Sequence, residues 1–325
     1  MRMAKMAVLA AIAAALVGRG DAAEAKKPGR PAIVASGMGF VEGPTVMVGG
    51  GFETRWLGSI YVVDNSQPDG IIWEAVRMGQ TTDTHKLQPW VKVGKPGNNG
   101  SKMGPDGWLY VASPGQKGIL RARRDGRNDK VEWIVTSATV ELNGPNDLVF
   151  NRNGDFYFTD PSWPKDKPGA VYLRRKSGEV VKIIPGIRTP NGIGLSPDEK
   201  TLYIAQSELN KIVKCAVRED GTVGEPEDFI RFEEPGTPDG MRVDDDGTIY
   251  QALYSARAVV ALSPEGKELW RVPLDWDLPK KKVDGYGVTN CAIAPNGLFV
   301  TRTHGGGQKN NGCLIFVPFS EAAKE

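Results

Sequence analysis

Short apolar runs separated by turn-forming residues make up most of the chain. Within residues 144–161, one apolar run ends at Phe150, the pair Asn153-Gly154 follows, and a second run leads to Asp160. Glycine adopts a positive φ at low cost, so Asn-Gly between two apolar runs predicts a β-hairpin. Both ends of a hairpin lie on the same side. The polar residues Asn146 and Asp160 are therefore expected at one face.

This hairpin pattern occurs six times along the chain, at spacings of about 45 to 57 residues. A repeat of that length with several strands in each unit is typical of a β-propeller. Each copy carries an aromatic residue at the second position of its second strand, and these residues are predicted to lie in the core. They are Tyr61, Tyr110, Tyr157, Tyr203, Tyr250 and Phe299.

Two further apolar runs follow each hairpin, which gives four strands in each unit. The predicted fold is therefore all-β, a six-bladed β-propeller with four-stranded antiparallel blades. The sixth unit lacks its last strand, and residues 31–35 can supply it, so that an N-terminal strand closes the last blade and removes an exposed sheet edge. No linker divides residues 26–325, which predicts a single domain.

The first 25 residues have the pattern of a secretory signal peptide. Arg2 and Lys5 precede an apolar run over residues 6–17, and Ala23-Glu24-Ala25 fits a small-x-small cleavage site. Cleavage would leave a periplasmic or secreted protein without a membrane attachment, and an uncleaved membrane anchor is the alternative. The net charge of +2 gives no electrostatic argument for nucleic-acid binding.

Neither the cysteines nor the standard catalytic motifs identify an active site in this sequence. Cys215, Cys291 and Cys313 all lie in apolar runs, which favours buried free thiols over a disulfide. The sequence holds no G-x-S-x-G, H-E-x-x-H or C-x-x-C motif, and with 2 histidines a Ser-His-Asp triad is not expected.

Oxygen-bearing side chains recur at one position of the repeat. The first strand of a propeller blade lies nearest the axis, so the residue at its start lies at one mouth of the central channel. Two carboxylates and several amides gathered there suit a hard divalent cation, Ca²⁺ before Zn²⁺ or Mg²⁺. The alternative is that the Asn-Gly and Asp-Gly pairs only start turns. The six residues are Glu42, Asn99, Asn146, Asn191, Asp239 and Asn290.

The second strands return to the same mouth and end in further polar residues. Asp160 either caps a loop or takes part in the chemistry, and Asp147 is expected to support the fold. His304 precedes three glycines, which places it on a predicted flexible loop. The residues near these strand ends are Asp64, Asn65, Ser113, Asp160, Ser207, Tyr254 and His304.

Several stretches together resemble the gluconolactonase family, whose relatives include regucalcin (senescence marker protein) and, more distantly, diisopropylfluorophosphatase and paraoxonase. One departure is the long insert at residues 49–56, where most members turn tightly. The matching stretches cover most of residues 40–315 and include Val41-Glu42-Gly43-Pro44, Asn143-Gly144-Pro145-Asn146-Asp147-Leu148, Tyr157-Phe158-Thr159-Asp160-Pro161, Thr189-Pro190-Asn191-Gly192 and Pro238-Asp239-Gly240-Met241-Arg242-Val243.

The resemblance implies a propeller with one catalytic divalent ion, usually calcium. The family's metal ligands would fall on Glu42, Asn191 and Asp239, and its blade-three asparagine on Asn146. Asn99 matches an asparagine of the bacterial lactonase branch. Family members hydrolyse sugar lactones, and some cleave phosphotriesters or other esters.

The resulting hypothesis is metal-assisted hydrolysis of a small-molecule lactone or related ester, by a monomer or weak oligomer. Asp239 is the first candidate for the base that activates water, and Asp160 is the second. Asn99, Asn290, Tyr254 and His304 are the predicted substrate-binding residues. Two alternatives are a non-enzymatic exported propeller that binds a sugar or protein around a structural ion, and a metal-free enzyme similar to strictosidine synthase.

Overall fold

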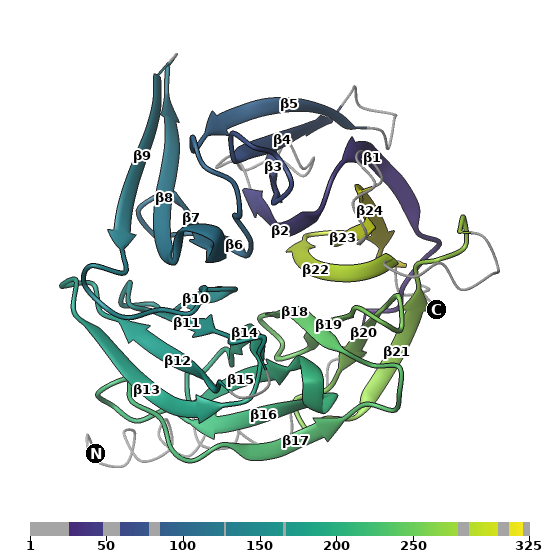
Figure 1. The fold of residues 1–325 in the computed structure, drawn as a ribbon. Coiled ribbons are helices and arrows are strands. Elements are labelled where there is room, and N and C mark those ends of the chain that lie inside the picture. Colours follow the sequence, from purple (N-terminus) through teal and green to yellow (C-terminus); the bar gives the residue numbers. More distant parts are fainter. Residues whose placement is uncertain are drawn as a thin grey trace, which may run out of the picture.

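The computed structural model describes residues 26–47, 59–77, 85–126, 128–164, 167–278, 286–304 and 312–320. These residues form six four-stranded antiparallel sheets arranged as blades around a central axis (Figure 1). The predicted six-bladed propeller is confirmed. Among the described residues, no helix is long and apolar enough to span a membrane. The predicted signal peptide and the insert at 49–56 lie outside the described residues.

Each of the first five blades is built from four consecutive strands. Blade 1 contains β2 (Val41–Met47), β3 (Ser59–Asp64), β4 (Ile71–Arg77) and β5 (His85–Lys92). Blade 2 contains β6 (Ser101–Met103), β7 (Leu109–Ser113), β8 (Gly118–Asp125) and β9 (Asn128–Val135). Blade 3 contains β10 (Leu148–Phe150), β11 (Phe156–Asp160), β12 (Gly169–Arg174) and β13 (Val180–Ile187).

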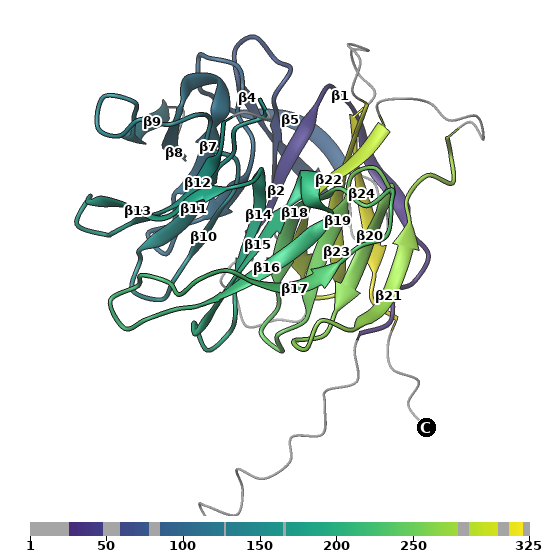
Figure 2. The ribbon, with the colours of Figure 1, turned by 60° about the horizontal axis from the view of Figure 1, so that its bottom comes forward.

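Blades 4 and 5 follow the same plan. Blade 4 contains β14 (Pro190–Leu195), β15 (Thr201–Gln206), β16 (Lys211–Ala216) and β17 (Glu227–Arg231). Blade 5 contains β18 (Pro238–Val243), β19 (Ile249–Leu253), β20 (Ala258–Leu262) and β21 (Glu268–Pro273). Seen from the side, the strands of the blades run between the two faces of the molecule (Figure 2).

Blade 6 joins the two ends of the described chain. It contains β22 (Tyr286–Ala294), β23 (Gly297–His304) and β24 (Gly312–Pro318), and β1 (Ala32–Met38) is its outermost strand. Ile33 pairs with Ile315 in an antiparallel register, which confirms the predicted closure by an N-terminal strand. The pairing covers the edge of β24, which would otherwise expose unpaired backbone groups.

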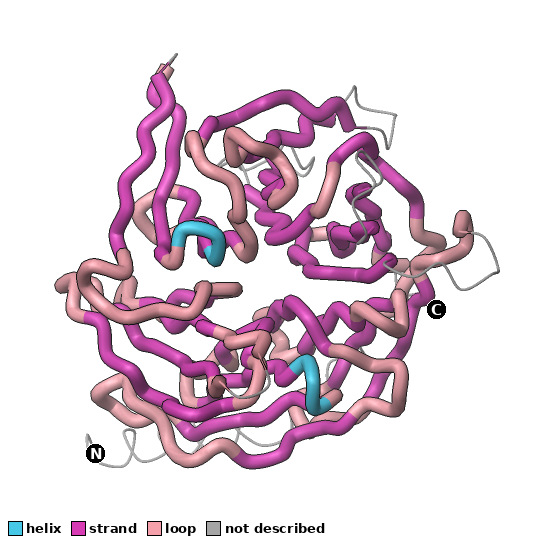
Figure 3. Tube along the Cα trace, in the orientation of Figure 1, coloured by secondary structure: helices cyan, strands magenta, loops and turns pink. Residues whose placement is uncertain are grey.

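Within the described ranges, two short 3₁₀ turns interrupt the strands and loops (Figure 3). They are η1 (Pro114–Gln116) and η2 (Ser207–Leu209), and each follows the second strand of its blade. Lys117 and Asn210 end these turns with φ values of 51° and 49°, in the left-handed region. Ser207, at the start of η2, is buried and faces the site described below.

The core lies between neighbouring sheets, where the predicted aromatic residues are buried. Tyr157 is 1% exposed and packs with Leu173 of its own blade and Ile204 of blade 4. Its hydroxyl group donates a hydrogen bond to the Gly221 carbonyl at 3.0 Å, so burial leaves no unpaired polar group. The three cysteines are buried and free, as predicted.

The glycine that follows an axial polar residue is required by packing around the axis. A Cβ atom on Gly192 would lie 2.3 Å from the Asp239 carbonyl oxygen, and one on Gly240 would lie 2.1 Å from the Asn290 side chain. Both glycines lie inside inner strands, β14 and β18, and not in turns. The Asn-Gly and Asp-Gly pairs therefore mark the close approach of neighbouring inner strands, and the interpretation as turn starters does not hold at these positions.

Candidate active site

A cavity of about 410 Å³ lies where the inner strands begin. Glu42, Asn191 and Asp239 are each the second residue of their strands, β2, β14 and β18. Because topologically equivalent positions of different blades converge on the axis, residues from distant parts of the sequence share this cavity. Its lining consists of Phe40, Glu42, Asn65, Asn99, Pro114, Asn146, Trp163, Asn191, Ser207, Thr237, Asp239 and Tyr254.

Irregular strand pairing orients the axial side chains. The β14–β15 register shifts between Pro190 and Ile193, which brackets Asn191, and the β18–β19 register shifts between Pro238 and Met241, which brackets Asp239. A bulge inserts an extra residue and turns a side chain away from the regular alternation. The preceding proline has no N–H group to leave unpaired. The Pro-Asn and Pro-Asp steps thus place a polar side chain at the axis.

The two carboxylates of the cavity lie without a compensating cation. No lysine, arginine or histidine is found among the described residues that line it. Burial raises the pKa of Glu42 well above its usual range, and the Asp239 and Asp147 carboxylates raise it further. Burial also raises the pKa of Asp239 strongly, against the hydrogen bond that the Asn191 side chain donates to it. Both acids would be stabilised by a cation that enters the cavity.

Two amide oxygens in the same place also lack partners. Asn99 Oδ1 and Asn191 Oδ1 are buried and accept no hydrogen bond. The Asn191 amide nitrogen donates to Ser207 Oγ at 3.1 Å, so its orientation is fixed with the oxygen left unused. A buried polar atom without a partner costs about 1–3 kcal/mol. Such atoms at a cavity wall are available to a ligand.

The donor set fits a hard divalent cation. Glu42 and Asp239 supply charge, and Asn99, Asn146 and Asn191 supply neutral amide oxygens, which suits Ca²⁺ or Mg²⁺ better than Zn²⁺. In the part of the chain that the structure describes, no group of three or more His, Cys, Asp or Glu residues is placed to share a metal ion. The fit therefore depends on amide oxygens around only two carboxylates.

A buried ion pair lies next to the acidic cavity in the central channel. Arg242 Nη1 donates to Asp147 Oδ2 at 3.0 Å, with side chains 5% and 0% exposed. Arg242 Nη2 also donates to the Ser101 carbonyl at 3.0 Å. The arginine, which lies three residues after Asp239, was missed in the sequence analysis. A charged residue inside the otherwise apolar run Met241-Arg242-Val243 was the available signal.

Asn290 lies beside the Arg242–Asp147 ion pair, in a second layer of the channel, and does not line the cavity. Asn290 Oδ1 accepts the N–H of Cys291 at 2.9 Å, and Asp147 Oδ1 accepts the N–H of Leu148 at the same distance. The two residues are therefore structurally equivalent, so the prediction for the axial position of blade 6 is one residue too late in the sequence. The Asn290 amide nitrogen lies 3.4 Å from Asp147 Oδ2 and also donates to Glu42. The Asn290 side chain therefore orients Glu42 and does not itself line the cavity.

Asp160 anchors a loop. Its two carboxylate oxygens accept the N–H groups of Asn143 and Gly144 at 2.9 and 2.7 Å, and it does not line the cavity. Burial raises its pKa, opposed by these two hydrogen bonds. Asp160 therefore fixes the segment that carries Asn146. Of the alternatives left open for it, the geometry favours the loop cap.

Tyr254 and His304 complete the set of predicted residues. Tyr254 lines the cavity, and burial, followed by the Asp239 and Glu42 carboxylates, raises its pKa. His304 is the last residue of β23, and its side chain lies outside the described part of the structure. Among the other residues near the ends of second strands, Asn65 and Ser207 also reach the cavity.

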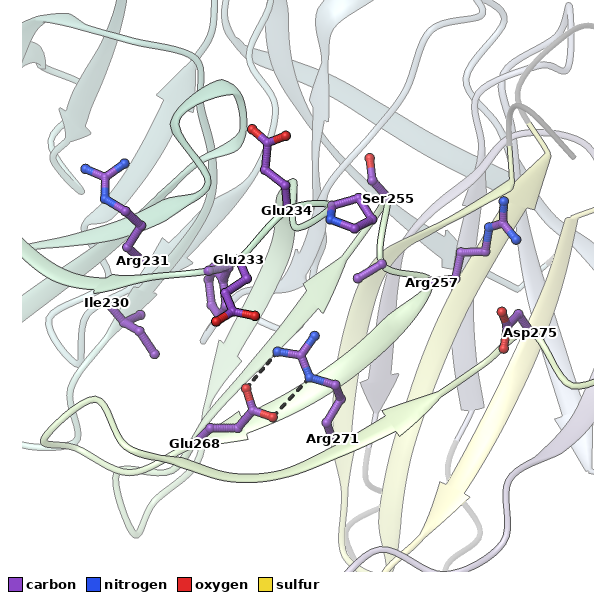
Figure 4. Close-up of a pocket in the computed structure, with 12 residues that line it drawn as sticks. Ile230, Arg231, Glu233, Glu234, Ser255, Arg257, Glu268, Arg271 and Asp275 are labelled. Carbon is purple, nitrogen blue, oxygen red and sulfur yellow. Dashed lines mark hydrogen bonds and ion pairs between the residues drawn. The ribbon is translucent and has the colours of Figure 1, made fainter. Parts of the chain in front are cut away.

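A second, larger hollow lies away from the axis, between blades 4 and 5. It measures about 760 Å³, and charged residues of both signs line it, among them Arg231, Glu233 and Glu234 (Figure 4). Glu268 and Arg271 pair with each other across its floor at 2.7 Å. None of the axial residues lines this hollow, so the axial cavity is the candidate active site.

The chain is similar to known lactonases. A gluconolactonase from Zymomonas mobilis is 25% identical over 84% of this chain and 78% of its own length. Lactonase drp35 from Staphylococcus aureus is 30% identical over 53% of this chain, a match that spans 55% of that protein.

Solved structures share the fold. A gluconolactonase from Xanthomonas campestris superposes with a TM-score of 0.69 at 23% identity, covering 93% of this chain and 94% of its own. A calcium-binding protein, regucalcin, from Agrobacterium tumefaciens gives a TM-score of 0.64 at 21% identity, covering 89% and 94%. The model of the SMP-30/gluconolactonase/LRE-like region matches residues 41–304. Since that match covers most of the chain and all six inner strands, this protein belongs to the SMP-30/gluconolactonase/LRE-like family.

Proposed function

We propose that this protein is a divalent-metal-dependent lactonase. The observation that carries the proposal is the meeting of two buried carboxylates with two partnerless amide oxygens in one axial cavity. Such a set binds a cation and leaves room for a substrate beside it. The names of the relatives, gluconolactonase and lactonase drp35, support lactones as the substrates, and the calcium-binding regucalcin supports Ca²⁺ as the first metal to test.

Glu42, Asn146, Asn191 and Asp239 would hold the ion. A bound divalent cation supplies Lewis acidity at the lactone carbonyl oxygen. Asp239 accepts a proton from the attacking water, since its carboxylate lines the cavity in which the lactone would bind. The water oxygen bonds to the carbonyl carbon, the ring C–O bond breaks, and the proton passes to the leaving alkoxide oxygen. We assign the base to Asp239 because Asp160 does not line the cavity and both its oxygens already accept backbone N–H groups.

The test removes the proposed base and ligand without changing its shape. Asp239→Asn is expected to lower kcat/KM for lactone hydrolysis by roughly 10³-fold and to weaken Ca²⁺ binding measured by calorimetry. The matched control is Asp228→Asn, an exposed aspartate that pairs with Arg231 on the outer strand β17, and it should behave as wild type.

Two results would overturn the proposal in different ways. A rate that survives both chelation by EDTA and the Asp239→Asn substitution would remove the metal-dependent mechanism. Tight Ca²⁺ binding without turnover of any lactone, simple ester or phosphotriester would indicate a binding propeller with a structural ion.

We also propose that the protein is exported to the periplasm or secreted. The charged start, apolar run and small-x-small site of residues 1–25 support this localisation. N-terminal sequencing of the native protein should give a chain that begins after Ala25. An intact Met1 in the membrane fraction would indicate an anchor instead.

A further inference from the structure

The second layer of the central channel contains a cation that the proposed reaction does not use. Lys102 is the middle residue of β6 and directly follows Ser101, whose carbonyl oxygen accepts the hydrogen bond from Arg242 Nη2 at 3.0 Å. The guanidinium group of Arg242 therefore lies beside the strand that carries Lys102. The two cations also occupy equivalent positions in their blades, since Lys102 lies opposite Tyr110 and Arg242 lies opposite Tyr250.

Six equivalent positions of the inner strands surround the axis at this level (Figure 1). Each lies opposite the buried aromatic residue in the second strand of its blade. Two of the six residues carry a charge, and both charges are positive. Blades 4 and 6 contribute only a glycine and an alanine, so their side chains fill little of this level. The six residues are Thr45, Lys102, Val149, Gly194, Arg242 and Ala292.

Lys102 lacks an anionic partner. Among the described residues, its ammonium group has no hydrogen-bond acceptor and no ion-pair partner. The side chain is half-buried, yet burial is the main cause that lowers the pKa of Lys102 to about 8. The Arg242 charge lowers this pKa further, and the attraction of Asp147 opposes the decrease. A close anionic partner would raise the pKa of a lysine, so the direction agrees with the missing ion pair.

The second layer has more positive charge and more N–H donors than its described residues satisfy. Asp147 is the carboxylate that Arg242 and Lys102 share, and it pairs directly with Arg242 alone. Arg242 donates to Asp147 and to the carbonyl oxygens of Met241 and Ser101, which occupies three of the five N–H groups of a guanidinium. Two N–H groups of Arg242 and the three of Lys102 are left to bind a ligand.

The surroundings favour a small anion with a single negative charge. One such charge balances the excess that Lys102 adds to the Arg242–Asp147 pair. Thr45 and Asn290 are 5% and 1% exposed, so the layer offers little space. Lys102 and Val149 keep partial exposure, which shows that solvent reaches this part of the channel. Chloride satisfies these conditions of charge, size and access.

We propose that Lys102 and Arg242 form a binding site for a small monovalent anion such as chloride in the central channel. The anion would accept charge-assisted hydrogen bonds from both residues and would compensate the lysine charge. The inference does not rest on the proposed lactonase function, because neither residue lines the axial cavity.

The first test measures the Tm of full-length protein in sodium chloride and in sodium methanesulfonate at equal ionic strength. Chloride at about ten times its Kd should raise the Tm by about 3 °C. Lys102→Met removes the charge and should abolish this difference, whereas Lys102→Arg should retain it. The matched control is Lys130→Met, which removes an exposed lysine that pairs with Asp125 on the outer hairpin of blade 2, and it should respond as wild type.

Equal Tm values of the wild type in the two salts would overturn the proposal. A chloride effect that persists in Lys102→Met would overturn the assignment to this lysine.

The second test locates the ion. Crystals of the wild type soaked in sodium bromide should show an anomalous scattering peak in contact with both Lys102 Nζ and the Arg242 guanidinium group. Crystals of Lys102→Met should lack this peak. Water alone at this position in the wild type, or an unchanged bromide peak in Lys102→Met, would overturn the proposal.

Discussion

The central channel contains two layers of buried acidic residues, and they differ in whether a cationic side chain pairs with the acids. In the cavity, Glu42 and Asp239 are buried together with no cationic side chain among the described lining residues, and burial raises their pKa values. In the adjoining layer, Asp147 is equally buried but pairs with Arg242 at 3.0 Å. Burial is the same in both places, so the difference lies in the partner. A buried acid with an internal cation serves the fold, and buried acids without one are poised for an external cation.

The two layers are coupled through one amide. The Asn290 nitrogen donates to Glu42 and lies 3.4 Å from Asp147 Oδ2, which links blades 1, 3 and 6 through the axis. Gly100 and Gly240 leave space for these two side chains, because a Cβ atom on Gly100 would lie 2.5 Å from Asp147 and one on Gly240 would lie 2.1 Å from Asn290. The layer that holds the blades together therefore also orients Glu42 in the cavity.

The largest effect on stability is expected from breaking the internal pair. Arg242→Met leaves Asp147 buried without its cation and should lower the free energy of unfolding by about 3–5 kcal/mol, measured by urea denaturation. The double variant Arg242→Met/Asp147→Asn removes both charges and should recover more than half of that loss. A loss below about 1 kcal/mol in the single variant would show that the Arg242–Asp147 pair does not stabilise the fold as proposed.

Removal of an acid from the cavity is expected to leave the stability unchanged or to increase it. Glu42→Gln removes one of two acids that repel each other, so the metal-free variant should be as stable as wild type or more so. Its Ca²⁺ affinity, measured by calorimetry, should fall by roughly 100-fold because a charged ligand is lost. Destabilisation of the metal-free variant comparable to that of Arg242→Met would show that Glu42 is part of the structural layer.

Stability against pH should separate the metal-free and calcium-bound forms. The folded state holds the protons of Glu42 and Asp239 to higher pH than the unfolded chain, whose carboxyl groups titrate near about pH 4. Their contribution to metal-free stability is therefore present below that pH and is lost as the pH rises through the raised pKa values.

Calcium would bind the deprotonated acids, so the increase in Tm that it produces should grow as the pH rises above about 4, where the unfolded carboxyl groups titrate. At about 100 times Kd the increase should reach roughly 5 °C, measured by scanning calorimetry. The double variant Glu42→Gln/Asp239→Asn should show no such pH-dependent increase. An increase that is constant over this range would mean that these two groups do not titrate on binding.

The smallest effect on catalysis is expected at Asp160. Asp160→Asn weakens the two hydrogen bonds that hold the loop before Asn146, which should cost about 1–3 kcal/mol of stability but less than about 10-fold in kcat. The asparagine variant keeps one acceptor oxygen, so Asp160→Ala should be the more destabilising of the two. A loss in kcat as large as that of Asp239→Asn, with stability unchanged, would show that Asp160 takes part in the reaction.

The sequence by itself determined the blades, their closure and most of the cavity. Asn-Gly and Pro-Asp steps at a regular spacing predicted that Glu42, Asn146, Asn191 and Asp239 converge, and all four line one cavity. Strand alternation and propeller topology are enough for this, because equivalent positions of every blade meet at the axis. Asn290 came out one residue away, since a shift of one residue along a strand turns a side chain into another layer.

Only the tertiary structure decided which acid acquires a cation. Asp147 and Arg242 are 95 residues apart and belong to blades 3 and 5, which are not neighbours in the ring. No local pattern specifies a contact made across the axis, because it depends on the diameter of the channel and on the space left by glycines without side chains. The hydrogen bond that Ser207 donates to the Pro238 carbonyl could not be predicted for the same reason, because its partner belongs to the next blade.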